Sequence, residues 1–340
     1  MSHTRPSRHQ PGASLAGRSQ GADGVEPAVA GGPPAWFAAA LQQEPEALRV
    51  DVDGCAVNGL AWGRRDRRPL VLIHGGAAHA NWWSPVAPSL ARDHRVVAVD
   101  LSGHGDSGHR AVYRAEQWAE EVLAVAEHAG GVGPPTVVGH SMGGFVAIVA
   151  AARHGASLDG TLLLDTPVRR VDRESIEGRK DRMFRAPKVY EDRETAVEHF
   201  HLFPPQPCDN PWMVGHIART SLRRVDGGWT WKFDPGVFVN REGLVLSSHF
   251  AEPLGRVEGR VAVLNGELSD VLDAEVRDHM VERLAASPAA AHGIPVIGVP
   301  HAHHHMMLDQ PLGVVAAVRS VLAAWRPTVA PTGESVAGAR

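Results

Sequence analysis

Short apolar segments alternate with longer segments of helical spacing over most of the chain, which predicts strands that alternate with helices. The apolar segments are nearly continuous runs of Val, Ile and Leu, as in strands buried on both faces of a sheet. These runs lie at residues 69–75, 94–101, 134–141, 160–165, 259–266 and 294–300, and the helical patterns lie at 114–130, 142–155, 273–286 and 311–325. Residues 49–63 predict an antiparallel hairpin ahead of them. We expect an α/β fold with a mostly parallel sheet and helices on both faces.

The alternation is absent at both ends of the chain and once in its middle. We expect a disordered leader over residues 1–35 and a disordered tail over 327–340, because Gly, Ala, Ser and Pro dominate both. The sheet and its helices then occupy 48–165 and 252–326. Residues 166–251 are first charged and then rich in aromatic residues and proline, which favours a mainly helical cap inserted over the carboxyl edge of the sheet.

Composition narrows the class of protein. The 340 residues carry a formal net charge of −4 without a basic stripe, so neither nucleic acid nor an anionic membrane is an expected partner. No apolar run reaches the roughly 20 residues of a membrane span. Only two cysteines occur, which favours a reducing compartment, and we expect a cytoplasmic protein.

The strongest chemical signal lies between a predicted strand and a predicted helix. Residues 139–143 read G-H-S-M-G and fit the G-x-S-x-G pattern of a nucleophile elbow centred on Ser141. A turn this tight leaves no room for flanking side chains, which explains Gly139 and Gly143. We therefore predict that Ser141 is a nucleophile at the N-terminus of a helix, where free N–H groups favour negative charge.

An acyl-transfer site also needs two backbone donors for the oxyanion of the tetrahedral intermediate. The N–H of Met142, directly after the nucleophile, is the first expected donor. The second should come from the loop after residues 69–75, where Gly76 is the preferred candidate and Ala77 the alternative. A glycine there lets the backbone approach the substrate closely.

Several carboxylates could orient the catalytic imidazole. With such an elbow, the order along the chain is serine, acid, histidine. Glu267, Asp270 and Asp273 follow a late strand, and Asp273 resembles a helix N-cap. We expect Asp270 to be the acid, with Asp165, at the end of an earlier strand, as the rival.

Four histidines crowd the loop before the last helix: His301, His303, His304 and His305. A purification tag normally has six or more consecutive histidines at a terminus. A metal site would need ligands that converge, whereas neighbours on an extended loop point in different directions. We expect no metal and no cofactor, and one general base among the four.

The chain resembles the α/β-hydrolase superfamily, in particular its serine esterase and lipase-like branch with a cap. The resemblance runs from about Arg49 to Trp325 and rests on HGG at His74, DLSGHGDSG at Asp100, GHSMGG at Gly139, GELSD at Gly266 and HHHMMLDQP at His303. Relatives commonly end in G-H-x-x-x-L-[DE]-x-P, and counting back from Pro311 implies His304 as the base. His303 then stands where relatives have glycine.

These residues predict a serine hydrolase that forms an acyl-enzyme on Ser141. The resemblance implies a carboxylic ester or lactone, small or medium in size and apolar, as substrate. A C–C bond or amide hydrolase with the same triad is one alternative, and a non-catalytic ligand-binding protein of the same fold is another. Substrate contacts are expected among Ala77, Trp82, Phe184, Trp212, Val271 and His305.

Overall fold

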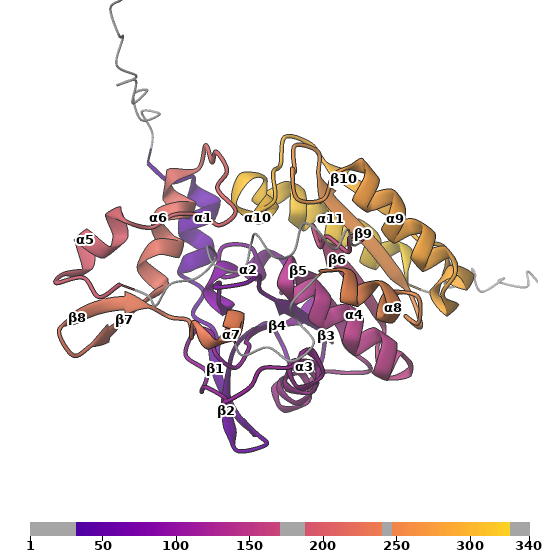
Figure 1. Ribbon diagram of the computed structural model, residues 1–340, viewed down its shortest axis with the longest axis horizontal. Helices are drawn as coiled ribbons and strands as arrows, with labels where there is room; N and C mark the ends of the chain where they lie inside the picture. Colours follow the sequence, from indigo (N-terminus) through magenta and orange to yellow (C-terminus); the bar gives the residue numbers. More distant parts are fainter. Residues whose placement is uncertain (1–31, 171–187, 240–246, 327–340) are drawn as a thin grey trace, which may run out of the picture. The chain divides into compact units, whose positions relative to one another are not determined.

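One eight-stranded sheet forms the centre of the computed structural model, which describes residues 32–170, 188–239 and 247–326 (Figure 1). Its strand order is β1-β2-β4-β3-β5-β6-β9-β10. The strands are β1 (Glu46–Val52), β2 (Cys55–Trp62), β3 (Arg68–Ile73), β4 (His94–Asp100), β5 (Thr136–His140), β6 (Gly160–Leu164), β9 (Val261–Gly266) and β10 (Val296–Val299). Pairing is antiparallel from β1 to β4 and parallel from β4 to β10. The predicted mostly parallel sheet is confirmed.

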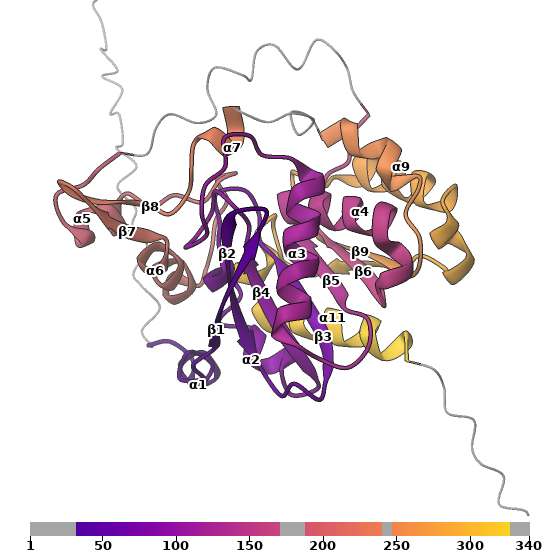
Figure 2. The same cartoon turned by 90° about the horizontal axis from the view of Figure 1, so that it is seen from below.

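Helices cover both faces of this sheet (Figure 2). One face carries α3 (Ala115–Ala129), α4 (Met142–His154), α8 (Ala251–Leu254) and α9 (Ala274–Ala285). The other face carries α1 (Ala35–Leu41), α2 (Ala87–Leu90), α10 (Met306–Asp309) and α11 (Pro311–Ala324). Short 3₁₀ turns lie at Ala80–Trp82, Gly155–Ser157, Ser247–Phe250 and Pro288–His292.

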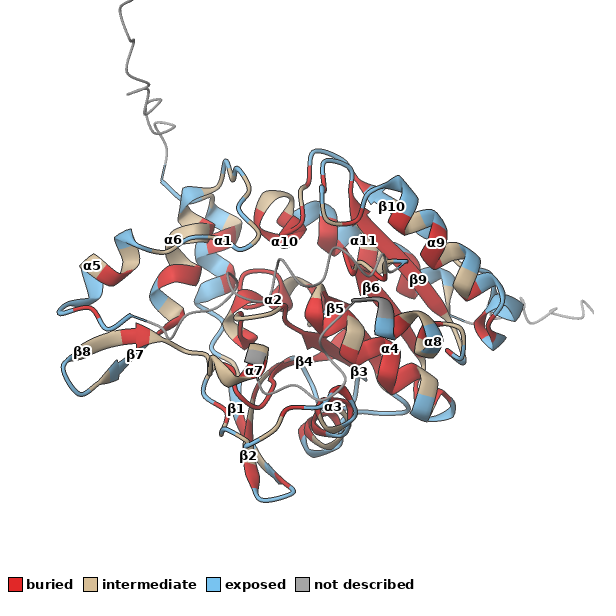
Figure 3. Ribbon diagram, viewed as in Figure 1, coloured by how far each residue is buried: buried red, intermediate tan, exposed pale blue. Residues whose placement is uncertain are grey.

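Burial explains why these segments form these elements. Every residue of β4, β5, β6 and β9 is buried, as expected for strands sandwiched between helices (Figure 3). Each fully buried Val, Leu or Ile contributes about 1.5–3 kcal/mol relative to an exposed one. Helix α3 ends at Gly130, whose φ of 74° few other residues tolerate. Asp273 accepts a hydrogen bond from the Val276 N–H at 2.9 Å, which confirms it as the N-cap of α9.

The described part of the segment between β6 and β9 is less helical than predicted. It contains α5 (Arg193–Glu198), α6 (Pro211–Thr220), α7 (Gly236–Val239) and a hairpin of β7 (Leu222–Val225) and β8 (Gly228–Trp231). Asp226 and Gly227 make the two-residue hairpin turn, and Gly227 and Gly228, the first residue of β8, have φ values of 86° and 144°. Such angles favour glycine, so the Gly-Gly pair was the available signal for this turn.

Helix α1 lies at the end of the expected leader and was not predicted. Trp36 and Phe37 pack edge-on against Trp212 of α6, with ring centroids 5.5 and 4.6 Å away. A helix of 7 residues is marginal alone, so these contacts stabilise it. The rest of the expected leader up to residue 31, and the expected tail, lie outside the described residues. No helix within the described ranges is long and apolar enough to cross a membrane.

Candidate active site

Ser141 occupies the turn between β5 and α4, with φ 52° and ψ −117°. Such backbone strain in a non-glycine residue costs of order 1–3 kcal/mol. The flanking glycines are sterically required. A Cβ on Gly139 would lie 2.3 Å from the Gly143 carbonyl oxygen, and a Cβ on Gly143 would lie 2.5 Å from that of His74. The local sequence therefore holds the serine in a conformation that a structural turn would rarely retain.

The loop after β10 brings His304 to this serine. His304 Nε2 lies 3.0 Å from Ser141 Oγ, within hydrogen-bonding distance. On its way the loop passes over the end of β9, so closely that a Cβ on Gly266 would lie 2.4 Å from the Ala302 carbonyl oxygen. The imidazole is buried, with only 4% of its side chain exposed. Of the four clustered histidines, His304 is the one positioned to accept the serine proton.

The acid that meets this histidine is Asp165 rather than Asp270. Asp165 Oδ2 lies 3.3 Å from His304 Nδ1, and the carboxylate is fully buried. Asp165 directly follows β6, the neighbour of β5, so its side chain reaches the same edge of the sheet as Ser141. Asp270 is exposed, and the structure describes no hydrogen bond from it to His304. The expectation for Asp270 is thus corrected in favour of its rival.

Asp165, and not Asp270, contacts His304 because the loop after β9 directs a side chain other than that of Asp270 toward the site. The Ser269 hydroxyl, and not the Asp270 carboxylate, is the group from this loop that interacts with Asp165. Ser269 Oγ also accepts hydrogen bonds from the N–H groups of Val271 and Leu272, at 3.2 and 3.3 Å. These bonds fix the loop with Ser269 inward and Asp270 toward solvent.

Burial shifts both titratable members of the site toward their neutral forms. It raises the pKa of Asp165 to about 8, against a smaller opposing effect of the Ser269 hydroxyl. It lowers the pKa of His304 to about 4. At neutral pH the imidazole is therefore unprotonated and can act as a base.

The two residues predicted to supply oxyanion donors lie near Ser141: Met142 follows it directly, and Gly76 follows Gly75, on which a Cβ would lie 3.4 Å from Ser141 Cβ. Met142 begins α4, a helix of 13 residues whose N-terminal dipole favours negative charge. A Cβ on Gly76 would lie 3.8 Å from Met142 Sδ, so Gly76 borders the Met142 side chain. Within the described residues, neither N–H donates to a backbone carbonyl. Ala77, the alternative donor, has a φ of 57° in the same turn.

The other expected substrate contacts lie in varied surroundings. Trp82 is buried, and its ring centroid lies 5.4 Å from that of His305. Trp212 packs against α1 and is partly buried at the edge of the hydrophobic core. The carbonyl oxygen of Val271 accepts a hydrogen bond from Arg169 Nη2 at 2.6 Å. Phe184 lies outside the described residues.

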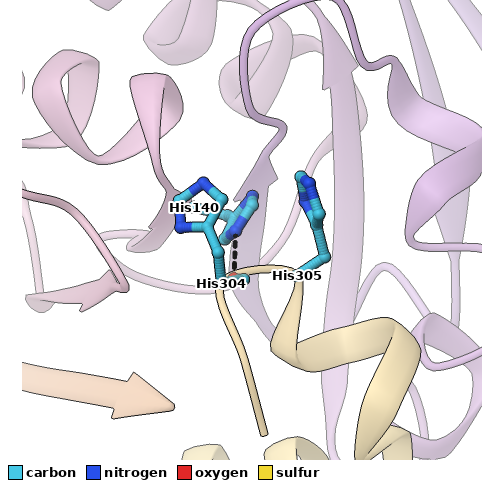
Figure 4. A group of neighbouring side chains, drawn as sticks. All are labelled: His140, His304 and His305. Atoms are coloured by element: carbon cyan, nitrogen blue, oxygen red, sulfur yellow. Dashed lines mark hydrogen bonds between the residues drawn. The ribbon is translucent and has the colours of Figure 1, made fainter. Parts of the chain in front are cut away.

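His305 is buried next to the catalytic histidine. It is 4% exposed, and the described residues offer neither of its ring nitrogens a hydrogen bond of good geometry. Its ring lies beside those of His140 and His304 (Figure 4). Burial lowers the pKa of His305 well below its usual range, and it lowers the pKa of His140 to about 3.

Two residues near the site were not predicted from the sequence. Phe238 of α7 lies over the oxyanion loop, where its Cε1 would be 3.4 Å from a Cβ on Gly76. Gln206 fastens the histidine loop: its Oε1 accepts from the His305 N–H at 2.7 Å, and its Nε2 donates to the Asp309 carboxylate at 2.9 Å. The aromatic and proline-rich composition of the inserted segment was their only signal.

A cavity of about 520 Å³ lies apart from these residues, between the β7–β8 hairpin and the loop that precedes α3. It is lined by His109, Val189, Arg223, Val225, Asp226, Thr230, Phe233, Asp234 and Pro235. None of them belongs to the group around Ser141, so we do not assign this cavity to the substrate of that site.

Known proteins share this sequence pattern and this architecture. The profile of a family described as alpha/beta hydrolase fold matches residues 68–204. A serine hydrolase-like protein of Danio rerio is 24% identical over 310 residues, which cover 83% of this chain and 90% of that protein. An esterase of Mycobacterium tuberculosis is 26% identical over 285 residues, which cover 82% of this chain and 89% of that protein.

Solved structures extend the similarity to nearly the whole described fold. The structure of E-2-(acetamidomethylene)succinate hydrolase superimposes with a TM-score of 0.68 at 20% identity, over 82% of this chain and 100% of that one. A structure of the M. tuberculosis esterase gives a TM-score of 0.65 at 21% identity, over 85% of this chain and 98% of that one. At such identities, structural similarity establishes the fold alone. The sequence matches to a serine hydrolase-like protein and to an esterase support hydrolase activity.

Proposed function

The chain belongs to the α/β-hydrolase superfamily, and from this premise we propose that it is a serine hydrolase that cleaves a carboxylic ester or lactone. One observation carries the proposal: the hydroxyl, imidazole and carboxylate of Ser141, His304 and Asp165 form a continuous series, with contacts of 3.0 and 3.3 Å. This is the arrangement that activates a serine for acyl transfer.

The proposed reaction proceeds in two halves. Ser141 Oγ attacks the substrate carbonyl carbon while His304 Nε2 takes the hydroxyl proton. The resulting oxyanion accepts hydrogen bonds from the N–H groups of Gly76 and Met142. The intermediate collapses, and the leaving alkoxide takes the proton from His304. Water then attacks the acyl carbonyl carbon and gives a proton to the same nitrogen. The second tetrahedral intermediate collapses, the bond to Ser141 Oγ breaks, and His304 returns the proton to that oxygen, which releases the acid and regenerates the free serine and the neutral imidazole.

Asp165 stabilises the imidazolium that forms twice in this cycle. Its carboxylate lies on the Nδ1 side of His304 and so favours the tautomer with the proton on Nδ1. That tautomer leaves the Nε2 lone pair directed at Ser141, as a general base requires. We therefore assign to Asp165 the role that we had expected of Asp270.

The surroundings of the serine support an apolar substrate. Phe238, Met142 and the small residues Gly75 and Gly76 lie around the proposed oxyanion hole. A site of this kind binds mostly through apolar contacts, with a few polar groups to fix orientation. Several relatives at low identity bear esterase names, among them the M. tuberculosis protein and a protein phosphatase methylesterase of Mus musculus.

Turnover of p-nitrophenyl acetate and butyrate by the full-length protein tests this function. Ser141→Ala and His304→Ala should each lower kcat/KM by about 10³-fold or more. His301→Asn is the matched control, because His301 is exposed and asparagine tolerates its φ of 54°. Undiminished turnover in Ser141→Ala would refute the proposal. A panel of esters, lactones and amides then shows which acyl bond is cleaved fastest.

A further inference from the structure

A buried histidine without a hydrogen-bond partner needs a physical explanation. His305 is 4% exposed, and the described residues leave both of its ring nitrogens unpaired. The backbone carbonyl groups of Phe203 and Pro204 lie near the ring and partly oppose the decrease in its pKa, but neither forms a hydrogen bond of good geometry with a ring nitrogen. Burying a polar group without a partner destabilises a folded protein. An apolar residue in this position would avoid that cost.

The unpaired ring belongs to a cluster of three imidazoles (Figure 4). The ring centroid of His304 lies 4.9 Å from those of both His140 and His305, and the latter two lie 5.7 Å apart. One ring nitrogen from each residue lies within 4.8 Å of one from each of the others. The sequence did not indicate this cluster, because His140 lies in β5 whereas His304 and His305 lie in the loop after β10, more than 160 residues later in the chain.

The hydrogen bonds of His140 leave it able to coordinate. Its Nε2 lies 2.9 Å from the His304 carbonyl oxygen and must carry the proton to donate there. In a neutral imidazole the lone pair is then on Nδ1. Both ring nitrogens of His305 are unpaired among the described residues, and the hydrogen bond described for the His140 ring involves Nε2 and not Nδ1.

We propose that His140, His304 and His305 form a site for Zn²⁺ and that Zn²⁺ bound there inhibits the enzyme. Three histidines with an open fourth position are a recurrent ligand set for this ion. Zn–N bonds of 2.0–2.1 Å place the nitrogens of a tetrahedral site about 3.4 Å apart, so the rings must approach one another by about 1.4 Å at most. Side-chain rotation on the His304–His305 loop can supply this movement. Ser141, which contacts His304, is half-buried rather than fully buried.

Inhibition follows from the position of His304, and this part of the proposal rests on the proposed function. His304 has two nitrogens: Nε2 faces Ser141 and Nδ1 faces Asp165. A metal bound through Nε2 removes the base from the serine. A metal bound through Nδ1 displaces the carboxylate and reverses the tautomer. Either geometry interrupts the proton path, so Zn²⁺ and catalysis exclude each other.

Calorimetric titration of the metal-free, full-length Ser141→Ala protein with ZnCl₂ tests binding without any need for activity. We expect one Zn²⁺ per chain, no binding of Mg²⁺, and at least tenfold weaker Zn²⁺ binding in a Ser141→Ala protein that also carries His305→Phe. His301→Asn and His303→Asn are matched controls on the same loop and should leave the affinity within twofold. Absence of Zn²⁺ binding, or weakening only by the two control variants, would overturn the site.

A second measurement avoids dependence on variants that could fail to fold. Co²⁺ added to the wild-type protein should give the intense visible absorption of a tetrahedral ion, and Zn²⁺ should abolish it. A spectrum typical of octahedral Co²⁺ would contradict the three-histidine site. Zn²⁺ should also suppress ester turnover by more than tenfold, and EDTA should restore it. If Zn²⁺ binds as expected but the metal-free wild type cleaves no ester, the proposed function fails while the metal site stands.

Discussion

Replacing Asp165 by asparagine separates the two candidate acids most sharply. Asparagine keeps the size of the side chain but removes its charge, and its amide can donate to His304 Nδ1. That donation favours the tautomer with the proton on Nε2, which cannot accept the serine proton. The corresponding change in a serine protease triad lowers kcat by about 10⁴-fold.

The structure adjusts this magnitude. Burial raises the pKa of Asp165, so part of the wild-type population carries a neutral carboxyl group at pH 7. We therefore expect Asp165→Asn to lower kcat by less at pH 7 than at pH 9, where the loss should approach about 10⁴-fold. Initial rates with p-nitrophenyl butyrate at both pH values, corrected for spontaneous hydrolysis, measure the difference.

Asp270→Asn is the matched control for this experiment. Asp270 is exposed and makes no described hydrogen bond to His304, so its replacement should change kcat by less than twofold. Thermal unfolding of both variants verifies that they fold. A loss above 10²-fold in Asp270→Asn, or more than one-tenth of wild-type activity in Asp165→Asn, would refute the assignment of the acid.

Four further predictions follow from the same geometry. Burial lowers the pKa of His304 to about 4 and raises the pKa of Asp165 to about 8. In a pH–rate profile, kcat should therefore rise in two steps near these two values, and the profile of Asp165→Asn should lack only the upper step. At pH values between the pKa of an unfolded aspartate and about 8, the folded state binds a proton at Asp165 that the unfolded state does not bind, so the free energy of unfolding decreases as pH rises through this range. The stability of Asp165→Asn relative to the wild type, measured by thermal unfolding, should therefore be greater at pH 8 than at pH 5. Gln206→Ala removes the acceptor of the His305 N–H and should lower kcat about tenfold with little change in KM, whereas a changed KM alone would contradict its role in holding the loop. Gly143→Ala should destabilise the protein by about 1–3 kcal/mol or more in urea unfolding, because the added Cβ meets backbone carbonyl oxygen at 2.5 Å, and an unchanged midpoint would show that the elbow relaxes.

Local patterns were sufficient to predict the sheet and to single out Ser141. Continuous Val, Ile and Leu runs predicted the buried strands, whereas His304 was implied by the resemblance to the α/β-hydrolase superfamily, whose members commonly end in G-H-x-x-x-L-[DE]-x-P. The residues two positions before and two positions after Ser141 are glycines, because a Cβ at either position would meet backbone atoms. All these signals lie within a few residues of the feature that they predict.

The acid could not be settled by local patterns. Both Asp165 and Asp270 follow strands that end at the same edge of the sheet, and chain order allows either. The choice depends on which side chain the loop after β9 turns inward, and hydrogen bonds of Ser269 to its own loop make that choice. The proximity of His140 to His305 is likewise a consequence of the strand order.

Short elements of the inserted segment and of the N-terminal region were hard to predict for a related reason. Helix α1 and the β7–β8 hairpin are too short for a periodic signal, and packing against distant residues stabilises them. Trp36 and Phe37, for example, meet Trp212 some 170 residues later in the chain.

Covalent capture of the nucleophile tests the central claim most directly. The full-length protein is treated with a fluorophosphonate, its intact mass is measured by mass spectrometry, and a proteolytic digest then locates the modified residue. We expect one adduct per chain on the peptide that contains Ser141, none in Ser141→Ala, and slow labelling in His304→Ala. An adduct on a different residue, or equal labelling of Ser141→Ala, would show that the hydroxyl, imidazole and carboxylate of this site are not its catalytic machinery.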